Sequence, residues 1–136
     1  RDGRYVFVTA DALVDAVAQA SVVEPEGLSL VVCQEDADRL GLRYDFVARW
    51  IMLTVHSSLS AVGLTAAVSA ALAEVGISCN VIAGRHHDHL LVPAARADDA
   101  LATLAERLPA PCLGRVPRLA LATPAAVAAH LSLSAL

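Results

Sequence analysis

The alternation of apolar and polar positions is clearest between residues 50 and 93, where it predicts a strand–helix–strand–strand unit. One apolar stripe recurs at helical spacing and consists of Leu64, Val68, Leu72 and Val75. Gly76 follows this stripe, at the position where helices commonly end in a left-handed residue. The predicted elements are a strand at 50–55, a polar break at 56–60, a helix at 61–75, a second strand at 78–84, a His-rich turn at 85–89 and a third strand at 90–93.

This order of elements has a preferred arrangement. The first two strands lie parallel and are joined by a right-handed crossover, and the third strand fits between them. The end of the first strand at His56, the start of the helix at 59–63 and the turn at 85–89 then converge on one edge of the sheet. We therefore expect a binding site at this edge.

The first 48 residues repeat a similar order of strands and helices in shorter segments. The predicted elements are a strand at 5–9, a helix at 11–19, a hairpin of strands 21–23 and 28–33 around a Pro-x-Gly turn, and a helix at 35–40 that ends at Gly41. We expect a degenerate repeat at 1–48, a second repeat at 49–108 with its last helix at 98–108, and a peripheral or partly disordered tail at 109–136 with a helix at 123–133. Because each half is small for a core of its own, we expect the two halves to share one.

The second repeat also carries a recognisable motif string. Val-His-Ser-Ser-Leu at 55–59, Val62-Gly63, Gly-Ile-Ser-Cys-Asn at 76–80 and His-Asp-His-Leu-Leu-Val-Pro at 87–93 resemble the ACT domain. The whole is similar to small bacterial tandem-ACT proteins, which are related to the ACT pairs of aspartate kinases and of cytosolic arginine sensors. The resemblance covers residues 5–108; the tail departs from it. It implies an α+β, ferredoxin-like βαββαβ fold in two tandem repeats that share one core, with an antiparallel sheet and helices on one face.

The polar break before the helix at 61–75 is the first candidate site. Helix N-termini leave backbone N–H groups unpaired and carry partial positive charge, which together favour an anion such as a carboxylate. The alternative is plain capping by Ser58 or Ser60. The resemblance implies that this loop and the following strand bind effectors. The candidate ligand-binding residues are His56, Ser57, Ser58, Leu59, Val62, Gly63, Leu64, Asn80, Val81 and Ile82. Because Gly63 lets backbone and ligand approach closely, we expect Gly63→Val to abolish binding with a modest effect on stability.

The turn at 85–89 is a secondary candidate, with His87, Asp88 and His89 as its residues. Three imidazoles and a carboxylate could bind a first-row metal. Strand alternation, however, puts at most His87 and His89 on one face, so that a third ligand would have to come from His56. We therefore expect no metal. No nucleophile elbow, P-loop or dinucleotide motif occurs, and we expect neither catalytic residues nor a cofactor.

The composition and charge of the chain limit the kinds of molecule that we expect it to bind. The net charge is −4, and no basic patch is interleaved with aromatic residues, so we expect no nucleic-acid partner. Residues 50–73 carry no charge, but their serines and threonines and the change of period argue against a membrane span. Three widely spaced cysteines fit a reducing cytoplasm. The 57% hydrophobic content predicts a homodimer or a higher oligomer.

We therefore predict a regulatory protein that binds a small molecule, an amino acid, at the strand-to-helix loop and the adjacent strand. Two alternatives remain: a ligand-free oligomerisation module that joins sheets edge to edge, and a metal-binding protein built on the His-rich turn.

Overall fold

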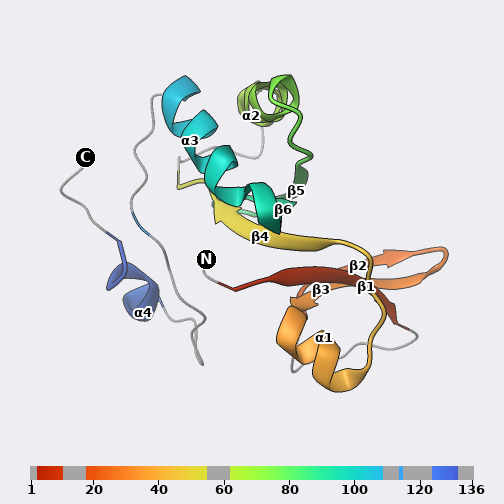
Figure 1. The fold of residues 1–136 in the computed structure, drawn as a ribbon. Helices are drawn as coiled ribbons and strands as arrows, with labels where there is room; N and C mark the ends of the chain where they lie inside the picture. The colour runs from red at the N-terminus through yellow and green to blue at the C-terminus, as the bar shows by residue number, and fades with distance from the viewer. Residues whose placement is uncertain (1–2, 11–17, 55–61, 109–113, 115–123, 132–136) are drawn as a thin grey trace.

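The computed structural model describes residues 3–10, 18–54, 62–108, 114 and 124–131 of the chain (Figure 1). In chain order the elements are β1 (Tyr5–Ala10), β2 (Ala18–Glu24), β3 (Gly27–Cys33), α1 (Gln34–Leu40), β4 (Val47–Met52), α2 (Leu64–Glu74), β5 (Asn80–Ala83), β6 (Asp88–Pro93), the 3-10 turn η1 (Ala94–Arg96), α3 (Ala97–Arg107) and α4 (Pro124–Ala128). None of these helices is long and apolar enough to cross a bilayer.

The strands form one six-stranded sheet in the order β2-β3-β1-β4-β6-β5, and all neighbours are antiparallel. Because β4 and β5 are both antiparallel to β6, they run parallel to each other with β6 between them. The arrangement expected from the order of elements in the second repeat is therefore confirmed.

The two halves of the sheet have matching registers. Phe7 of β1 lies opposite Val31, and Trp50 of β4 lies opposite Leu91. On the outer strands, Ala20 pairs with Val31 just as Asn80 pairs with Leu91. The halves meet at a short β1–β4 contact in which Tyr5 pairs with Ala48 and Val6 with Val47. The chain is therefore an internal duplication of one supersecondary unit.

The helices of both halves cover the same face of this curled sheet. Val47 packs against the core beneath α1, whereas Ile51 packs against the core beneath α2 and α3. These side chains are four residues apart on one strand and so share a face. Figure 1 shows α2 and α3 over the β4–β6 half and α1 beside the β1–β3 half. The α+β, ferredoxin-like fold with helices on one face is thus confirmed.

The opposite face, which α1, α2 and α3 do not cover and which we call the helix-free face, carries a core cluster drawn from both halves. Tyr5, Val31 and Cys33 come from the first half, and Ala48, Trp50 and Leu91 come from the second; all six are buried. Tyr5 and Trp50 meet edge to face, with ring centroids 5.2 Å apart. The expectation of a shared core is therefore confirmed.

The end of α2 follows the sequence pattern closely. Gly76 is left-handed with a φ of 69°, its N–H donates to the carbonyl of Ala73 at 2.9 Å, and Ile77 donates to Leu72 at 2.9 Å. This pair of bonds is the Schellman ending. Val75, however, lies beyond the last helical residue and is 36% exposed, so its assignment to the buried stripe was wrong.

Other boundaries differ from those expected. β4 begins at Val47 rather than at residue 50, because strand pairing with β1 and β6 accommodates Arg49 within it. Ala18 and Gln19 belong to β2, so the helix predicted for 11–19 is wrong at its end, and 11–17 lie outside the described residues. In the tail, α4 ends at Ala128, well short of residue 133.

Candidate functional site

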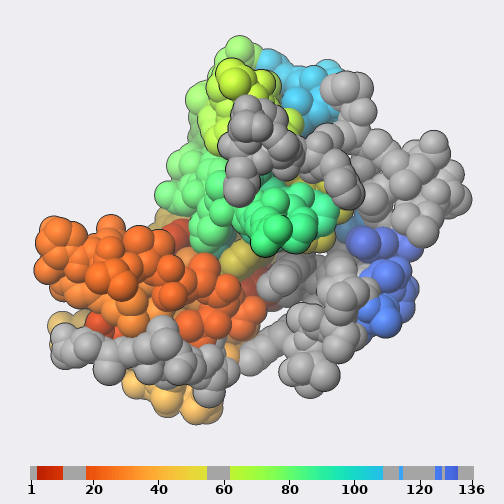
Figure 2. Space-filling model, turned by 180° about the vertical axis from the view of Figure 1, so that it is seen from behind, coloured from red at the N-terminus to blue at the C-terminus, as the bar shows by residue number. Residues whose placement is uncertain are grey.

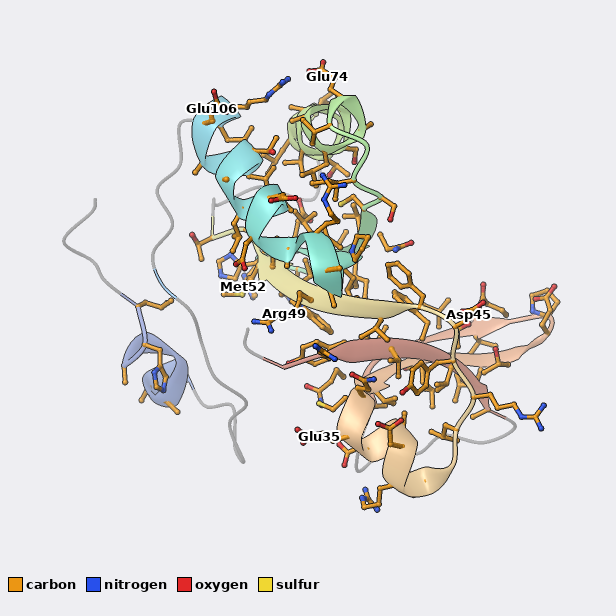
Figure 3. All side chains as sticks on the ribbon, viewed as in Figure 1. Glu35, Asp45, Arg49, Met52, Glu74 and Glu106 are labelled. Carbon is orange, nitrogen blue, oxygen red and sulfur yellow. The ribbon has the colours of Figure 1, made fainter. Side chains whose placement is uncertain are left out.

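Three chain segments meet where the strands of the second half of the sheet end. They are the end of β4, the start of β6 and the turn between β5 and β6, and we call this place the loop edge. The N–H of Leu53 donates to the carbonyl of Asp88 at 2.8 Å, just after Met52 pairs with His89. Ala83 pairs with Asp88 across the turn. Figure 3 labels Met52 at this end of β4.

The start of α2 is open. The helix begins after Gly63, which has a φ of 105°, provides no side-chain cap and is followed by no acidic residue in the first turn. The N-cap position is Gly63, and Ser58 and Ser60 lie outside the described residues. The first internal helical bond runs from Ala67 to the carbonyl of Gly63, at 2.8 Å. The N–H groups of residues 64–66 lie before it and make no bond within the helix.

The surroundings of Gly63 are equally open. Among the described residues, no atom lies within 4 Å of a Cβ atom placed on Gly63, and the preceding Val62 is 99% exposed. Leu64 anchors the first turn, since its side chain packs against the core beneath α2 and α3. Leu64 therefore holds the first turn of α2 against this core. His56, Ser57, Ser58 and Leu59 lie outside the described residues.

Asp88 belongs to the same region. It is half-buried and stands two residues before Leu90, a core residue on the helix side of β6. Alternation along the strand therefore places Asp88 on the helix side of the loop edge, the side from which α2 starts. Asp88, a carboxylate that favours cations, therefore lies on the face of the sheet that α2 covers, whereas the N–H groups at the start of α2 favour anions.

His89 points to the other face and has a structural contact. The indole Nε1–H of Trp50 donates to His89 Nδ1 at 3.0 Å, and the two rings meet edge to face at 5.4 Å. This bond requires the neutral imidazole tautomer that carries its proton on Nε2. Periodicity could not reveal the contact because it depends on strand register. Across the described residues, no group of three or more His, Cys, Asp or Glu side chains could hold a metal ion.

The residues predicted on the following strand do not join the start of α2. Asn80 is exposed at the far end of β5, and its amide lies 3.5 Å from the carbonyl of Leu91. Ile82 packs into the cluster on the helix-free face, and alternation puts Asn80 on that face as well. Val81 packs beneath the helices. The structure therefore does not bring Asn80 to Gly63.

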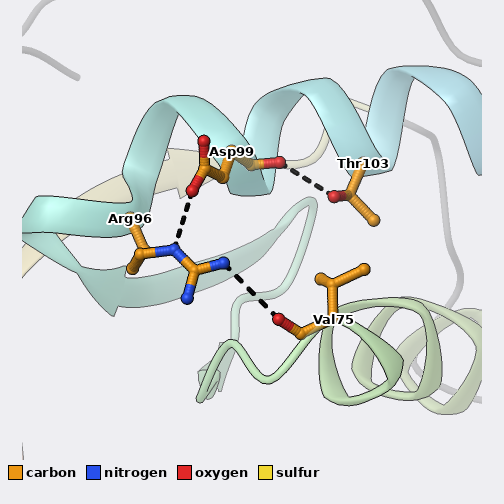
Figure 4. A network of polar contacts seen from close by, with 4 residues as sticks. All are labelled: Val75, Arg96, Asp99 and Thr103. Atoms are coloured by element: carbon orange, nitrogen blue, oxygen red, sulfur yellow. Dashed lines mark hydrogen bonds and ion pairs between the residues drawn. The ribbon is translucent and has the colours of Figure 1, made fainter.

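Polar contacts fix the far end of α2. The guanidinium of Arg96 bonds the carboxylate of Asp99 through Nε at 2.7 Å and reaches the carbonyl of Val75 through Nη2 at 3.4 Å (Figure 4). Arg107 of α3 also forms an ion pair with Glu74. Exposed pairs of this kind contribute little energy each. Their effect is to set the position of α2 against α3.

Cys79 is not an activated nucleophile. Cys79 is half-buried against the core beneath α2, and this burial raises the pKa of its thiol above the ordinary value. The thiol is therefore protonated at neutral pH, which is the unreactive form.

Comparison with known proteins adds four findings. A 39-residue stretch is 80% identical to the ATP-dependent dethiobiotin synthetase BioD of Pseudomonas aeruginosa and 54% identical to that of Cellvibrio japonicus. This stretch is 29% of the chain, and the chain spans only 17% of the length of these relatives. A Vibrio cholerae crystal structure, VC0802, a protein of unknown function described as a possible transport protein, matches with a TM-score of 0.72 and 47% identity over 76% of this chain and 82% of that one. Atu0741 from Agrobacterium tumefaciens, at 21% identity over 77% of this chain and 83% of its own, shares the fold with a TM-score of 0.61.

Two family models match in tandem. Both describe an ACT domain, one over residues 1–49 and the other over residues 45–106. ACT domains are small-molecule-binding regulatory modules. The matches confirm the resemblance seen in the motif string and follow the internal duplication of the sheet. The chain therefore belongs to the ACT domain family, as a tandem-ACT protein.

Proposed function

We propose that this protein is a regulatory sensor that binds an amino acid at the start of α2 and responds by changing its shape or its association. The observation that carries the proposal is the open helix start. Gly63 itself offers the first-turn N–H groups no side-chain cap, and among the described residues no atom lies within 4 Å of the place where its Cβ would stand. Backbone N–H groups and the helix dipole at such a position favour a carboxylate.

Asp88 supplies the complementary group. An amino acid carries an ammonium next to its carboxylate, and a half-buried carboxylate on the helix side of the loop edge is suited to the ammonium. In this proposal the ligand carboxylate faces Gly63 and Leu64, the ammonium faces Asp88, and the loop at 56–59 completes the site. Asn80, Val81 and Ile82 have structural roles instead.

A thermal-shift screen of the twenty amino acids tests the proposal. A ligand at about a hundred times its dissociation constant stabilises the native state by roughly 2.7 kcal/mol. For a chain of this size that corresponds to a melting temperature several degrees higher. A flat screen would contradict the sensor proposal.

The role of Asp88 has its own test. Asp88→Asn should weaken binding of the amino acid found in the screen by about tenfold or more, the scale of a charged hydrogen bond. The same change should leave the affinity for the corresponding des-amino acid unaltered, since that ligand has no ammonium. Asp45→Asn, an exposed change in the first half of the chain, is the control and should alter neither affinity. Equal losses for both ligands in Asp88→Asn would contradict the assignment.

The second candidate function is a ligand-free module that associates edge to edge, and the exposed β2 edge favours it. Association also fits the sensor, and we propose a homodimer in the cytoplasm. The BioD match covers too little of that enzyme to bring its activity to this chain. We therefore propose a role without catalysis, cofactor or metal, and with neither a membrane nor a nucleic-acid partner.

A further inference from the structure

The one tryptophan of the chain is bonded to a side chain that can take up a proton. Trp50 is 4% exposed, and its indole Nε1–H donates to Nδ1 of His89 at 3.0 Å. Nδ1 can accept this bond only in the neutral imidazole, because protonation of the ring leaves a hydrogen on both nitrogens and makes both of them donors. This side-chain bond between β4 and β6 therefore exists only while His89 is neutral.

The imidazole of His89 lies between the indole and the turn that joins β5 to β6. A Cβ atom placed on Gly84 would lie 3.2 Å from Nε2 and 3.4 Å from Cδ2 of His89, so the ring is close to the backbone of the turn. Across the sheet, His89 pairs with Met52 of β4 and with Ile82 of β5. Any displacement of this ring therefore affects Trp50 on one side and the turn on the other.

Protons from the solvent can reach this place. His89 is half-buried, and Figure 2 shows part of the β5–β6 hairpin, in green, at the surface of the molecule. Imidazole is the side chain whose ordinary pKa, about 6.5, lies within the physiological pH range. A moderate fall in pH is therefore enough to change its charge.

The ionisable groups on the same face of the sheet do not stabilise a charged His89. His87, which is itself basic, stands two residues earlier, and the bond from the Gly84 N–H to its carbonyl continues the strand pairing, so alternation places it on this face. In the core cluster on this face, Tyr5 and Cys33 carry a phenol and a thiol, groups that are uncharged in mild acid. Within β4, β5 and β6, no carboxylate lies on the helix-free face.

The remaining charged groups of these elements lie on the opposite face or at the tip of the turn. Asp88 is on the helix side of β6, and Arg49 is on the helix side of β4. Arg85 and His86 form the exposed tip of the turn. Because Asp88 is the one carboxylate in this set and both arginines are cations, the set has no net negative charge that would favour protonation of His89.

Trp50 also belongs to the contact between the two halves of the chain. Its ring meets that of Tyr5 edge to face, with ring centroids 5.2 Å apart. The backbone contact at this place is short, since β1 and β4 pair through Tyr5 with Ala48 and through Val6 with Val47. The side-chain packing around Trp50 therefore helps to hold the halves together.

We propose that His89 is a pH-sensitive switch that controls the packing between the two halves. In the neutral state the imidazole accepts the indole N–H and holds Trp50 in position against Tyr5. In the protonated state Nδ1–H faces the indole N–H, so that two donors oppose each other and the bond is lost. Trp50 is then no longer fixed from β6, and the contact between the halves loosens. The switch needs no ligand and is independent of the proposed amino-acid site.

The direction of the pH effect follows from this bond. The folded chain loses the indole bond when His89 takes up a proton, whereas the unfolded chain has no such bond to lose. The unfolded chain therefore takes up this proton at the higher pH, near the ordinary imidazole pKa of about 6.5. The contribution of His89 to the free energy of unfolding is complete above this pH and is lost as the pH falls below it.

The indole resonance of Trp50 tests the switch. Because the chain has one tryptophan, the isotope-labelled protein gives one indole N–H resonance. In the wild type this resonance should move upfield between about pH 8 and 5, with one midpoint, as the hydrogen bond is lost. The melting temperature should fall over the same range. An indole resonance that stays in place down to about pH 5 would overturn the proposal.

Two variants at position 89 separate the titration of this histidine from that of the others. His89→Asn puts a carbonyl oxygen close to the position of Nδ1 and does not titrate, so the indole resonance should be independent of pH. His89→Phe keeps a ring but has no acceptor, so the resonance should be displaced at every pH. His86→Asn, a change at the exposed tip of the turn, is the matched control and should keep the wild-type midpoint. A transition that persists in both variants of His89 would belong to another group and contradict the switch.

Amide hydrogen exchange tests the effect on the two halves. Between about pH 7.5 and 5.5, the protection factors of the amides at the β1–β4 contact should fall by about tenfold or more in the wild type. The same protection factors should be unchanged in His89→Asn, which keeps an acceptor at both pH values. An equal fall in the two proteins, or no fall in the wild type, would show that His89 does not control the contact between the halves.

Discussion

Replacing Gly63 by alanine tests the backbone argument at the centre of the site. Gly63 has a φ of 105°, a conformation that residues with a Cβ rarely adopt. The new methyl group meets no atom within 4 Å, so no clash adds to the backbone strain. That strain alone should destabilise the fold by about 1–2 kcal/mol. The melting temperature should fall by roughly 3–8 °C for a chain of this length. The helix-propensity argument does not apply at this position, because Gly63 stands before the helix at positive φ.

Gly76→Ala is the matched control at the other end of the same helix. Gly76 also has a positive φ, 69°, and equally open surroundings. Both variants should lose similar stability in thermal melts. Only Gly63→Ala should also weaken binding of the amino acid found in the screen, by about tenfold or more, because its methyl group stands beside the first-turn N–H groups. Unchanged stability in Gly63→Ala would refute the strain argument, and equal affinities in the two variants would move the site elsewhere.

The remaining predictions concern the core and the loop edge. His89→Phe should destabilise the fold by about 1–3 kcal/mol, because the indole N–H of the buried Trp50 loses its acceptor, and Trp50 fluorescence should shift. Gly84→Ala should lower the melting temperature, since its Cβ would lie 2.6 Å from a carbonyl oxygen of the turn. Leu72→Ala should cost about 2–5 kcal/mol in denaturant unfolding. The pKa of the Cys79 thiol is higher in the folded chain than in the unfolded chain, so the unfolded chain loses this proton at a lower pH. The free energy of unfolding should therefore fall as the pH rises above the ordinary pKa of a cysteine thiol. Alkylation of native Cys79 by iodoacetamide at pH 8 should accordingly be slower than in the unfolded chain.

Much of the architecture was predictable because its signals are local. The Leu64, Val68 and Leu72 stripe predicted the buried face of α2, and all three pack beneath the helices. Gly41 and Gly76 predicted two helix ends, and both are left-handed. The position of β6 between β4 and β5 followed from the order of elements, because crossover connections leave few alternatives.

The features that sequence reasoning missed depend on pairing between distant strands. The contact of His89 with Trp50 arises from the register of β6 on β4, which no periodicity encodes. The sequence suggested that Asn80 binds a ligand, yet its pairing with Leu91 puts it at the end of β5 that lies away from the loop edge. Asp88 was grouped with the histidines of its turn, and only strand alternation separates its face from that of His89.

Backbone amide NMR during a ligand titration tests the central claim most directly. With the amino acid found in the screen, the N–H resonances of Leu64, Thr65 and Ala66 should show the largest shifts, because a carboxylate bonded to these groups changes their environment. The resonances of β2 should not respond at protein concentrations where the chain is monomeric. Saturable shifts concentrated on another element, or none with any amino acid at about 10 mM, would contradict the proposal that the start of α2 is the ligand site.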